Sequence, residues 1–314
     1  MATVRILRRD DVEASLDMRA CIDAVEAAFV AHAAGRAELP GVIHLEVPEA
    51  GGEIHVKAGH LHGAPAYAVK VASGFSGVDP PAIDGLVLVF DAATGAPLAF
   101  LLDGGYLTDL RTGAAGGVAA RHLARADAAV AAVLGSGIQA RRQIEALRVV
   151  RPSVREVRVW GRDPAKAAAA AADVDGVVAG SVDEAVDGAH VVLTCTASRA
   201  PLVTLDMLAP GAHVTAVGSD GAGKQELDPA ILRAAEVLVA DSVPQSRSLG
   251  ELQHAPDQAE RAVELGSVAA GAAPGRTGDD QLTVCDLTGV GVQDVAAAAA
   301  ALTHAGDRGI AVDL

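Results

Sequence analysis

The chain has 314 residues, and its 40 acidic residues outnumber its 25 lysines and arginines, which gives a formal net charge of −15. An acidic chain of this kind is poorly suited to bind nucleic acid or an anionic membrane surface. It has no run of about 18 or more large apolar residues, so we expect no membrane-spanning helix. The first residues lack the apolar segment of a secretory signal, and we therefore expect a cytoplasmic protein.

The length allows two domains, each with a core of its own. Cys21, Cys195 and Cys285 are widely spaced and form neither a Cys-x-x-Cys nor a Cys/His pattern. The sequence therefore predicts three reduced cysteines and no metal site.

The N-terminal part of the chain predicts one helix followed by short strands. Between Asp17 and Gly35, apolar residues recur every three to four positions, which is typical of an amphipathic helix. Turn residues then separate four β-type runs, at 53–57, 67–73, 85–91 and 97–103. The last two predict a hairpin with Thr94 and Gly95 at its tip, and residues 108–123 predict a helix that leads into the next domain.

Residues 130–140 combine a β-type run with a glycine turn, and a helical segment follows at 141–150. The turn reads Gly135, Ser136, Gly137, Ile138, Gln139 and Ala140. Gly135 permits a tight turn, Gly137 lets the backbone approach a pyrophosphate, and Ala140 allows close packing of helix on strand. Such a turn alone is a weak signal, but a second strand-like run at 154–160 has the expected spacing. The segment therefore predicts a dinucleotide-binding site.

From residue 128 onward, β-type runs alternate with helical stretches. The runs lie at 128–134, 154–160, 177–179, 190–194, 213–217, 237–240 and 283–286, and the clearest helices at 164–172 and 229–235. This alternation is typical of a doubly wound parallel sheet, while residues 266–280 predict a surface loop. A last helix near 293–305 would return to the first domain. We therefore expect a Rossmann-type domain at 119–295 and a discontinuous α+β domain at 1–118 with 296–314.

Ligands of such sheets bind beyond the carboxyl ends of the strands, so polar residues at those ends are candidates. Val217, Gly218 and Ser219 lead to Asp220, which could be a general acid/base or could simply cap a turn. Two further groups could contact the cofactor or belong to ordinary polar loops. They are Thr194 with Thr196, and Thr288 with Gly289.

The residues after the second strand bear on the choice of dinucleotide. An NAD-specific domain usually places an acid there for the ribose 2′-hydroxyl, whereas this chain has Trp160, Gly161 and Arg162. Arg162 suits a 2′-phosphate, which favours NADP(H) over NAD(H). Asp163 follows directly and could cap the next helix or serve the ribose.

Two cations of the first domain are candidate substrate ligands. Lys70 interrupts an apolar strand and shares a face with Ala68 and Ala72, so it either meets a ligand or reaches solvent from an edge strand. Arg111 could take a carboxylate bidentately or form a structural ion pair, with Asp109 as the nearest candidate. His55 and Lys57 share one face of a short strand and are weaker candidates.

Together these segments resemble the ornithine cyclodeaminase/mu-crystallin family. The resemblance rests on YAVKVASGF at 67–75, residues 85–91, LLDGGYLTDLRTG at 101–113, GSGIQA at 135–140, VGSDGAGKQELD at 217–228 and DLTGVGVQDV at 286–295. It implies a homodimer joined through a substrate domain. It also implies that Lys70 and Arg111 hold a substrate carboxylate, with Asp220 as acid/base or water-positioning group.

One position departs from the family pattern. The neighbourhood of Pro40 lacks the carboxylate-binding arginine that many members have there, which argues against direct transfer of ornithine recognition. Lys57 stands where many members have an apolar residue, and we interpret it as a replacement cation.

The resemblance implies three alternative functions. The first is an NAD(P)H-dependent imine reductase or amino-acid dehydrogenase that acts on a small α-imino or α-keto acid. The second is a cyclodeaminase, a lyase that uses NAD+ catalytically, and the third is a non-catalytic binding protein like the crystallin branch. The presence of Lys70, Arg111 and Asp220 together favours an enzyme.

Overall fold

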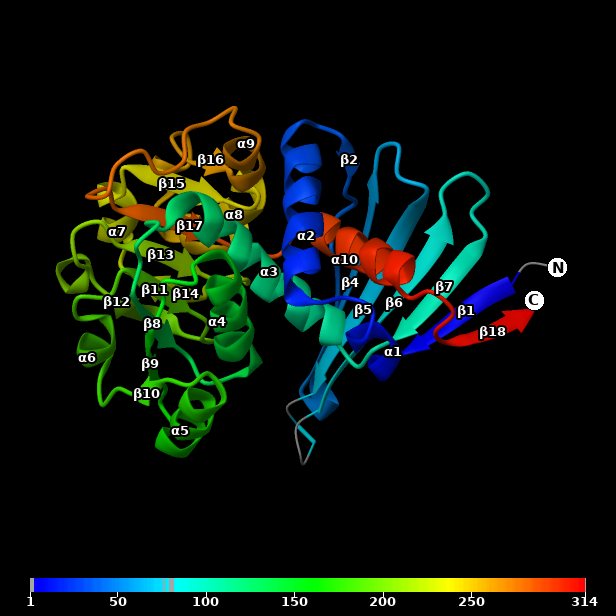
Figure 1. The fold of residues 1–314 in the computed structure, drawn as a ribbon, viewed down its shortest axis with the longest axis horizontal. Helices are drawn as coiled ribbons and strands as arrows, with labels where there is room; N and C mark the ends of the chain where they lie inside the picture. Colours follow the sequence, from blue (N-terminus) through cyan, green and yellow to red (C-terminus); the bar gives the residue numbers. More distant parts are fainter. Residues whose placement is uncertain (1–2, 76, 79–81, 314) are drawn as a thin grey trace. The chain divides into compact units, whose positions relative to one another are not determined.

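The computed structural model describes residues 3–75, 77–78 and 82–313 (Figure 1). The chain divides into two compact units, one of residues 1–111 with 291–314 and one of residues 112–290. The expected domain boundaries at 118/119 and 295/296 lie several residues later in the chain than the divisions between these two units. The first of them fell inside a helix, because α3 runs unbroken as Tyr106–Leu123 across the division.

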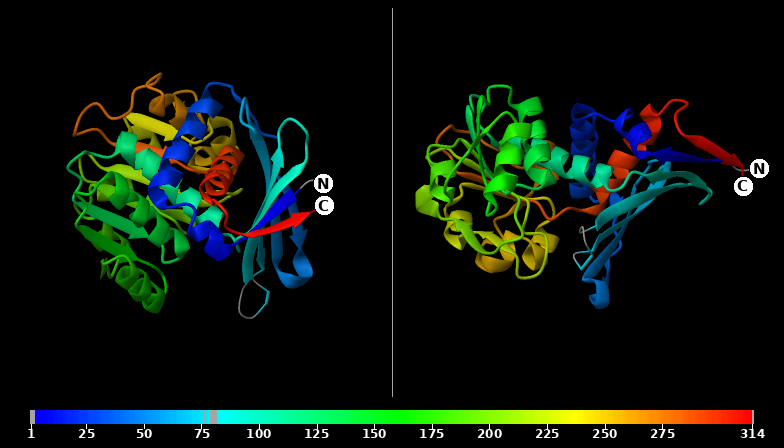
Figure 2. Two further views of the ribbon diagram at one scale, coloured as in Figure 1. Left: turned by 45° about the vertical axis from the view of Figure 1, so that its right-hand side comes forward. Right: turned by 90° about the horizontal axis from the view of Figure 1, so that it is seen from below.

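Unit 1 is built on one mixed sheet, in which β3 pairs with β4 and the other strands follow the order β18-β1-β7-β6-β5-β4-β2. The strands are β1 (Thr3–Arg8), β2 (Ala37–Glu38), β3 (Ile43–Val47), β4 (Gly52–Leu61), β5 (Ala66–Phe75), β6 (Ala82–Asp91), β7 (Pro97–Leu102) and β18 (Ile310–Asp313). The four predicted runs correspond to β4 to β7, and Gly95 takes a positive φ of 73° at the predicted hairpin tip. Strands β1 and β18 place the two ends of the chain side by side (Figure 2).

Two long helices cover one face of this sheet, α2 (Met18–Ala33) and α10 (Gly291–His304), and the short α1 (Arg9–Glu13) follows β1. The predicted first helix is confirmed. Asp17 caps α2 by accepting a hydrogen bond from the Ala20 N–H at 2.8 Å, and Gly35 ends the helix region with a φ of 68°. Helix α10 packs against α2, β4 and β5, so residues from the end of the chain line the same core as residues from its beginning.

Unit 2 is built on a parallel sheet in the order β10-β9-β8-β11-β13-β17-β15-β16. The strands are β8 (Val130–Leu134), β9 (Glu156–Trp160), β10 (Val177–Val178), β11 (Val191–Thr194), β13 (His213–Ala216), β15 (Val237–Ala240), β16 (Val263–Glu264) and β17 (Thr283–Asp286). The order runs outward on both sides of β8 and β11, as in doubly wound folds. The predicted fold class is confirmed.

The helices of unit 2 connect these strands, and a small parallel pair, β12 (Arg199–Val203) and β14 (Gln225–Leu227), stands apart. The helices are α4 (Ile138–Val150), α5 (Pro164–Asp173), α6 (Val182–Val186), α7 (Pro229–Ala234), α8 (Val243–Leu249) and α9 (Leu265–Ala269). The predicted loop at 266–280 was wrong at its start, because Leu265 and Val268 bury their side chains and hold α9 in place. None of the described helices combines the length and apolar character that crossing a bilayer requires.

Candidate functional site

The turn after β8 has the geometry of a phosphate-binding turn. Gly135 takes a φ of 134°, which side chains rarely tolerate, and its N–H donates to the Trp160 carbonyl at 2.8 Å. A Cβ at this position would lie 2.7 Å from both the carbonyl oxygen and the Sγ of Cys195. Only glycine therefore fits between β8 and the loop after β11.

The next residues start α4 and leave room in front of it. Gly137 is the N-cap of α4, with Ile138 and Gln139 in its first turn, and a Cβ added at Gly137 would meet nothing within 4 Å. Ala140 is 1% exposed and packs into the core beneath the sheet. Unpaired N–H groups at a helix N-terminus attract anions. This arrangement therefore fits the pyrophosphate of a dinucleotide.

A cleft of about 300 Å³ opens in front of this turn. It is lined by residues 135–137, 160–163, 166, 195–198 and 202. Arg162 and Lys166 contribute two cations to the lining. Asp163 accepts hydrogen bonds from the Ala165 and Lys166 N–H groups at 3.0 and 3.1 Å, so it caps α5, one of its two expected roles.

The strand-end threonines of β11 are held by a buried carboxylate, Glu226. The Thr194 hydroxyl donates to it at 2.7 Å, the Thr196 N–H and hydroxyl at 2.6 and 2.7 Å, and the Gly218 N–H at 2.8 Å. Thr194 is fully buried and does not line the cleft, whereas Thr196 does. Burial raises the pKa of Glu226, and these four donors partly offset that effect.

Thr288 and Gly289 are held in the same way. The Thr288 N–H and hydroxyl and the Gly289 N–H donate to Asp241 at 2.9, 2.8 and 2.6 Å. Asp241 itself is fully buried, and burial raises its pKa. Their polar groups thus fix the loop after β17.

The segment after β13 places Asp220 at the surface. Val217 and Ser219 are buried, and the Ser219 hydroxyl donates to the Lys224 carbonyl at 3.0 Å. The Asp220 side chain is 52% exposed and pairs with the Lys224 ammonium at 2.5 Å. A charged partner within the same loop therefore competes for the carboxylate that the sequence suggested as acid/base.

The candidate substrate cations of unit 1 meet at a third buried residue, Asp294. Lys70 Nζ lies 3.1 Å from the Asp294 carboxylate and Arg111 Nε lies 2.9 Å from it. Arg111 also donates to the Gln293 side chain at 2.8 Å. The side chains of Lys70, Arg111 and Asp294 are 3%, 6% and 5% exposed, so the whole group is removed from bulk water.

Close packing of α10 on β4 brings Asp294 next to Lys70 and Arg111. A Cβ at Gly59 would lie 3.0 Å from Val295, and one at Gly291 would lie 2.9 Å from the Ala58 carbonyl. Helix and strand can approach only because both positions lack a side chain. Strand β5 is internal to the sheet, so the alternative of a solvent-seeking edge lysine was wrong, and the ion pair of Arg111 is formed with Asp294.

Burial and charge set the protonation of this group. Burial lowers the pKa of Lys70 to about 7, and the adjacent Asp294 carboxylate limits the fall. Burial raises the pKa of Asp294, but Arg111 and Lys70 outweigh it and hold that pKa below its usual value. Lys57 lies opposite Lys70 in the β4–β5 register and adds positive charge on the same face. Two or three cations thus surround one carboxylate.

The sequence profile of the ornithine cyclodeaminase/mu-crystallin family matches residues 3–306. The chain belongs to this family. A putative dehydrogenase of Rhizobium meliloti is 44% identical over 322 residues and 97% of both chains. An uncharacterized cyclodeaminase of Sinorhizobium fredii is 42% identical over 325 residues and 98% of both chains.

Solved structures of similar proteins cover the chain completely. An archaeal alanine dehydrogenase dimer with bound NAD matches with a TM-score of 0.91 and 33% identity over 100% of both chains. The iminosuccinate reductase of Paracoccus denitrificans in complex with NAD+ matches with a TM-score of 0.90 and 30% identity over 100% of both chains. The first is a dehydrogenase and the second a reductase.

The sequence interpretation missed four residues that shape the two sites of this ornithine cyclodeaminase/mu-crystallin family member. They are Asp294, Glu226, Asp241 and Lys166. Lys166 carried a signal, because it stands four residues after Arg162 in the first turn of a predicted helix. Glu226 and Asp294 lie within the segments on which the family resemblance rests, and Asp241 directly follows the predicted run at 237–240. The sequence did not show their partners, because most of these lie far away in the chain.

Proposed function

We propose that this protein is an NAD(P)H-dependent imine reductase or amino-acid dehydrogenase that acts on a small α-imino or α-keto acid. The observation that carries the proposal is the buried group of Lys70, Arg111 and Asp294. With one carboxylate between two cations, the group has a net positive charge in a water-excluded place, and a substrate carboxylate would balance it. Asp294 Oδ2 is buried and makes no hydrogen bond within the described chain, so it can accept one from a substrate N–H.

The roles within this site follow from the chemistry of each side chain. Arg111 is held by Asp294 and Gln293 and presents a fixed guanidinium to the substrate carboxylate. Lys70 has a pKa of about 7, so near neutral pH it can hold a proton at Nζ or give it up to the reacting nitrogen. Asp220 is proposed as a further acid/base, which requires that Lys224 release it.

The dinucleotide is proposed to bind at the cleft of unit 2. Its pyrophosphate would lie against the N–H groups of residues 136–138, with Trp160 and Thr196 in the lining. Residues 217–219, 288 and 289 are proposed as further contacts through groups other than the N–H groups of Gly218, Thr288 and Gly289, which already donate to Glu226 and Asp241. The bound nicotinamide supplies the hydride. We further propose a preference for NADP(H), since Arg162 and Lys166 offer two cations and Asp163 already caps α5. NAD(H) would be the weaker cofactor.

Absorbance of reduced nicotinamide tests the function directly. Purified protein would be given NADPH or NADH with a panel of cyclic and acyclic α-imino acids and α-keto acids with ammonia. Oxidation of the cofactor supports the proposal. Lys70→Ala and Asp220→Ala should then reduce turnover far more than they weaken cofactor binding, and equal losses in both would contradict the proposed roles.

A cyclodeaminase is the second candidate, because the Sinorhizobium fredii relative carries that description and is 42% identical. Such an enzyme would release ammonia from ornithine in the presence of NAD+ without a net change in nicotinamide absorbance. The missing arginine after Pro40 counts against ornithine as substrate. Measuring ammonia and absorbance in parallel separates the two candidates.

We also propose that the protein is a cytoplasmic homodimer joined through unit 1. Ile43 and Leu45 are 61% and 53% exposed and share one face of β3. Ile310 and Val312 of β18 are also exposed, and apolar patches of this kind are typical of subunit interfaces. Light scattering of the wild type and of Ile43→Glu would test the assembly, and a wild-type monomer would contradict it.

A further inference from the structure

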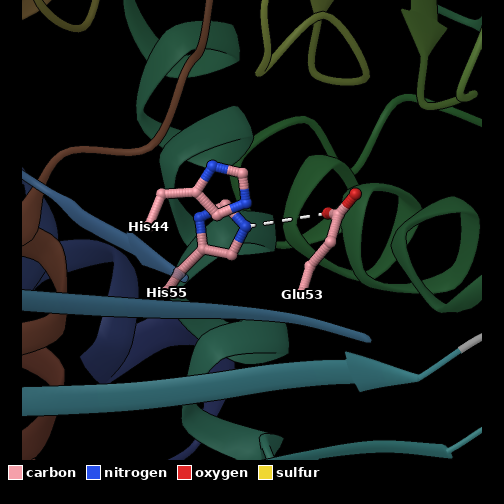
Figure 3. A group of neighbouring side chains, drawn as sticks. All are labelled: His44, Glu53 and His55. Atoms are coloured by element: carbon pink, nitrogen blue, oxygen red, sulfur yellow. Dashed lines mark ion pairs between the residues drawn. The ribbon is translucent and has the colours of Figure 1, made fainter. Parts of the chain in front are cut away.

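On the face of the sheet that carries Lys57, strands β3 and β4 bring together two imidazoles and a carboxylate that neither proposed site uses (Figure 3). His44 lies directly opposite His55 in the antiparallel register. Glu53 precedes His55 by two residues, so its side chain leaves β4 on the same face. Each residue offers one ligand atom, and these atoms lie within 4.8 Å of one another.

We propose that His44, Glu53 and His55 bind a divalent transition-metal ion of the Zn²⁺ type. Two imidazole nitrogens and one carboxylate oxygen form a typical three-residue zinc ligand set that leaves a fourth position for water. The proposal departs from the sequence interpretation, which predicted no metal site. The pattern was hidden because His44 belongs to a different strand from the other two ligands.

The side chains need only small movements to reach coordination distance. The His44 and His55 rings are stacked, with centroids 4.6 Å apart and planes inclined by 23°, and His55 Nε2 lies 3.8 Å from Glu53 Oε2. Bonds of about 2.1 Å in a tetrahedral site hold ligand atoms roughly 3.4 Å apart. His44 and Glu53 are exposed, so side-chain rotation can close the remaining distance without moving the backbone.

The surroundings leave space for the ion and supply charge of both signs. The β5 neighbours of His55 and Glu53 are Ala72 and Gly74, and a Cβ added at Gly74 would meet nothing within 4 Å. Glu46 lies opposite Glu53 in the register and adds negative charge on this face. Lys57 lies two residues beyond His55 and opposes cation binding.

The proposed ligands belong to two neighbouring strands, because His44 lies on β3 and both Glu53 and His55 lie on β4. A bound ion would therefore link the edge strand β3 to the body of the sheet through β4, in addition to the hydrogen bonds between these two strands.

Metal titration of the untagged holoenzyme tests the proposal without measuring activity. After chelator treatment, Zn²⁺ would be added in a calorimeter, and Co²⁺ in a spectrophotometer, where tetrahedral coordination gives visible absorption. We expect one ion per chain with a dissociation constant in the micromolar range or below. His44→Ala and Glu53→Gln should each weaken binding at least tenfold.

His62→Ala is the matched control. His62 pairs with Glu38 at 3.3 Å, yet among the described residues the only group of three possible ligands is that of His44, Glu53 and His55. The control should bind the ion as the wild type does. Absence of saturable binding would overturn the proposal, as would equal affinity in His44→Ala and the wild type or an equal loss in the control.

Discussion

Replacing Asp294 with Asn should lower the pKa of Lys70 and shift the pH range of catalysis. In the wild type, burial lowers the pKa of Lys70 to about 7, and the Asp294 carboxylate is the largest influence in the opposite direction. Asn keeps the size of the side chain and removes its charge. The positive charges of Arg111 and Lys57, which also lower the pKa of Lys70, remain.

The structure gives the size of this effect. Lys70 Nζ lies 3.1 Å from the Asp294 carboxylate, and two unit charges at this distance attract by about 5 kcal/mol at an effective dielectric constant of about 20. That energy corresponds to roughly 4 pKa units. Entry of water and movement of Arg111 offset part of it, so we expect a fall of at least about 1 unit.

The assay is the pH dependence of kcat/KM for an α-imino acid with NADPH. A protonated Lys70 attracts the substrate carboxylate, so kcat/KM should decline on the alkaline side as the lysine loses its proton. In Asp294→Asn this decline should begin at least about 1 pH unit lower than in the wild type. Titration of the substrate itself is common to both proteins and cancels in the comparison.

Two further measurements make the result interpretable. Asp313→Asn changes an exposed carboxylate of the same unit and should leave the profile unchanged. The KM for NADPH should also stay constant in Asp294→Asn, because the dinucleotide cleft belongs to unit 2. An alkaline limb that stays in place, or moves to higher pH, would refute the assigned interaction between Asp294 and Lys70.

Three other predictions concern unit 2. Gly135→Ala should lower dinucleotide affinity at least tenfold, or prevent folding, because its Cβ would lie 2.7 Å from the Cys195 carbonyl oxygen; cofactor titration and circular dichroism distinguish the two. Arg162→Ala should raise the KM for NADPH at least tenfold more than that for NADH, and equal changes would contradict the NADP(H) preference. Burial raises the pKa of Asp286 to about 7. The folded protein therefore binds more protons than the unfolded chain between about pH 4 and pH 7, and the free energy of unfolding falls as pH rises through that range. Asp286→Asn should remove this decrease in the free energy of unfolding, which is on the order of 4 kcal/mol across the range. Urea unfolding at several pH values would measure it, and the same pH dependence of stability in the variant and the wild type would contradict it.

Local features of the sequence predicted the fold well. The turn at Gly135 is specified by residues next to one another, and the alternation of β-type runs with helices is visible along the chain without knowledge of contacts. Lys70 also stood out locally, because an ammonium group within an apolar strand requires an explanation. The short strands β1, β3 and β18 were not predicted. The side chains of β3 and β18 are largely exposed, and β1 buries Val4 and Leu7, whose spacing of three does not follow the alternation of a strand.

The sequence did not reveal the hydrogen-bond and ion-pair partners of the predicted residues. Arg111 and Asp294 are 183 positions apart, and only the close approach of α10 to β4 at Gly59 and Gly291 brings them together. Asp109, two residues from Arg111, was the natural candidate when only sequence distance was known. The position of Asp294 in a helix near the end of the chain does not indicate which strand this residue will contact.

The polar residues at the strand ends of unit 2 show why strand-end position alone does not identify ligand contacts. Glu226 accepts four hydrogen bonds, from Thr194, Thr196 and Gly218. Asp241 likewise accepts from Thr288, Gly289 and its neighbouring N–H. Carboxylates this deeply buried are tolerated only when donors surround them. Several polar groups expected to face the cofactor are therefore committed to fixing the loops, and the N–H groups at the start of α4 remain as the principal contacts for the pyrophosphate. This edge of the sheet is thus arranged before any ligand arrives, which reduces the ordering that binding requires.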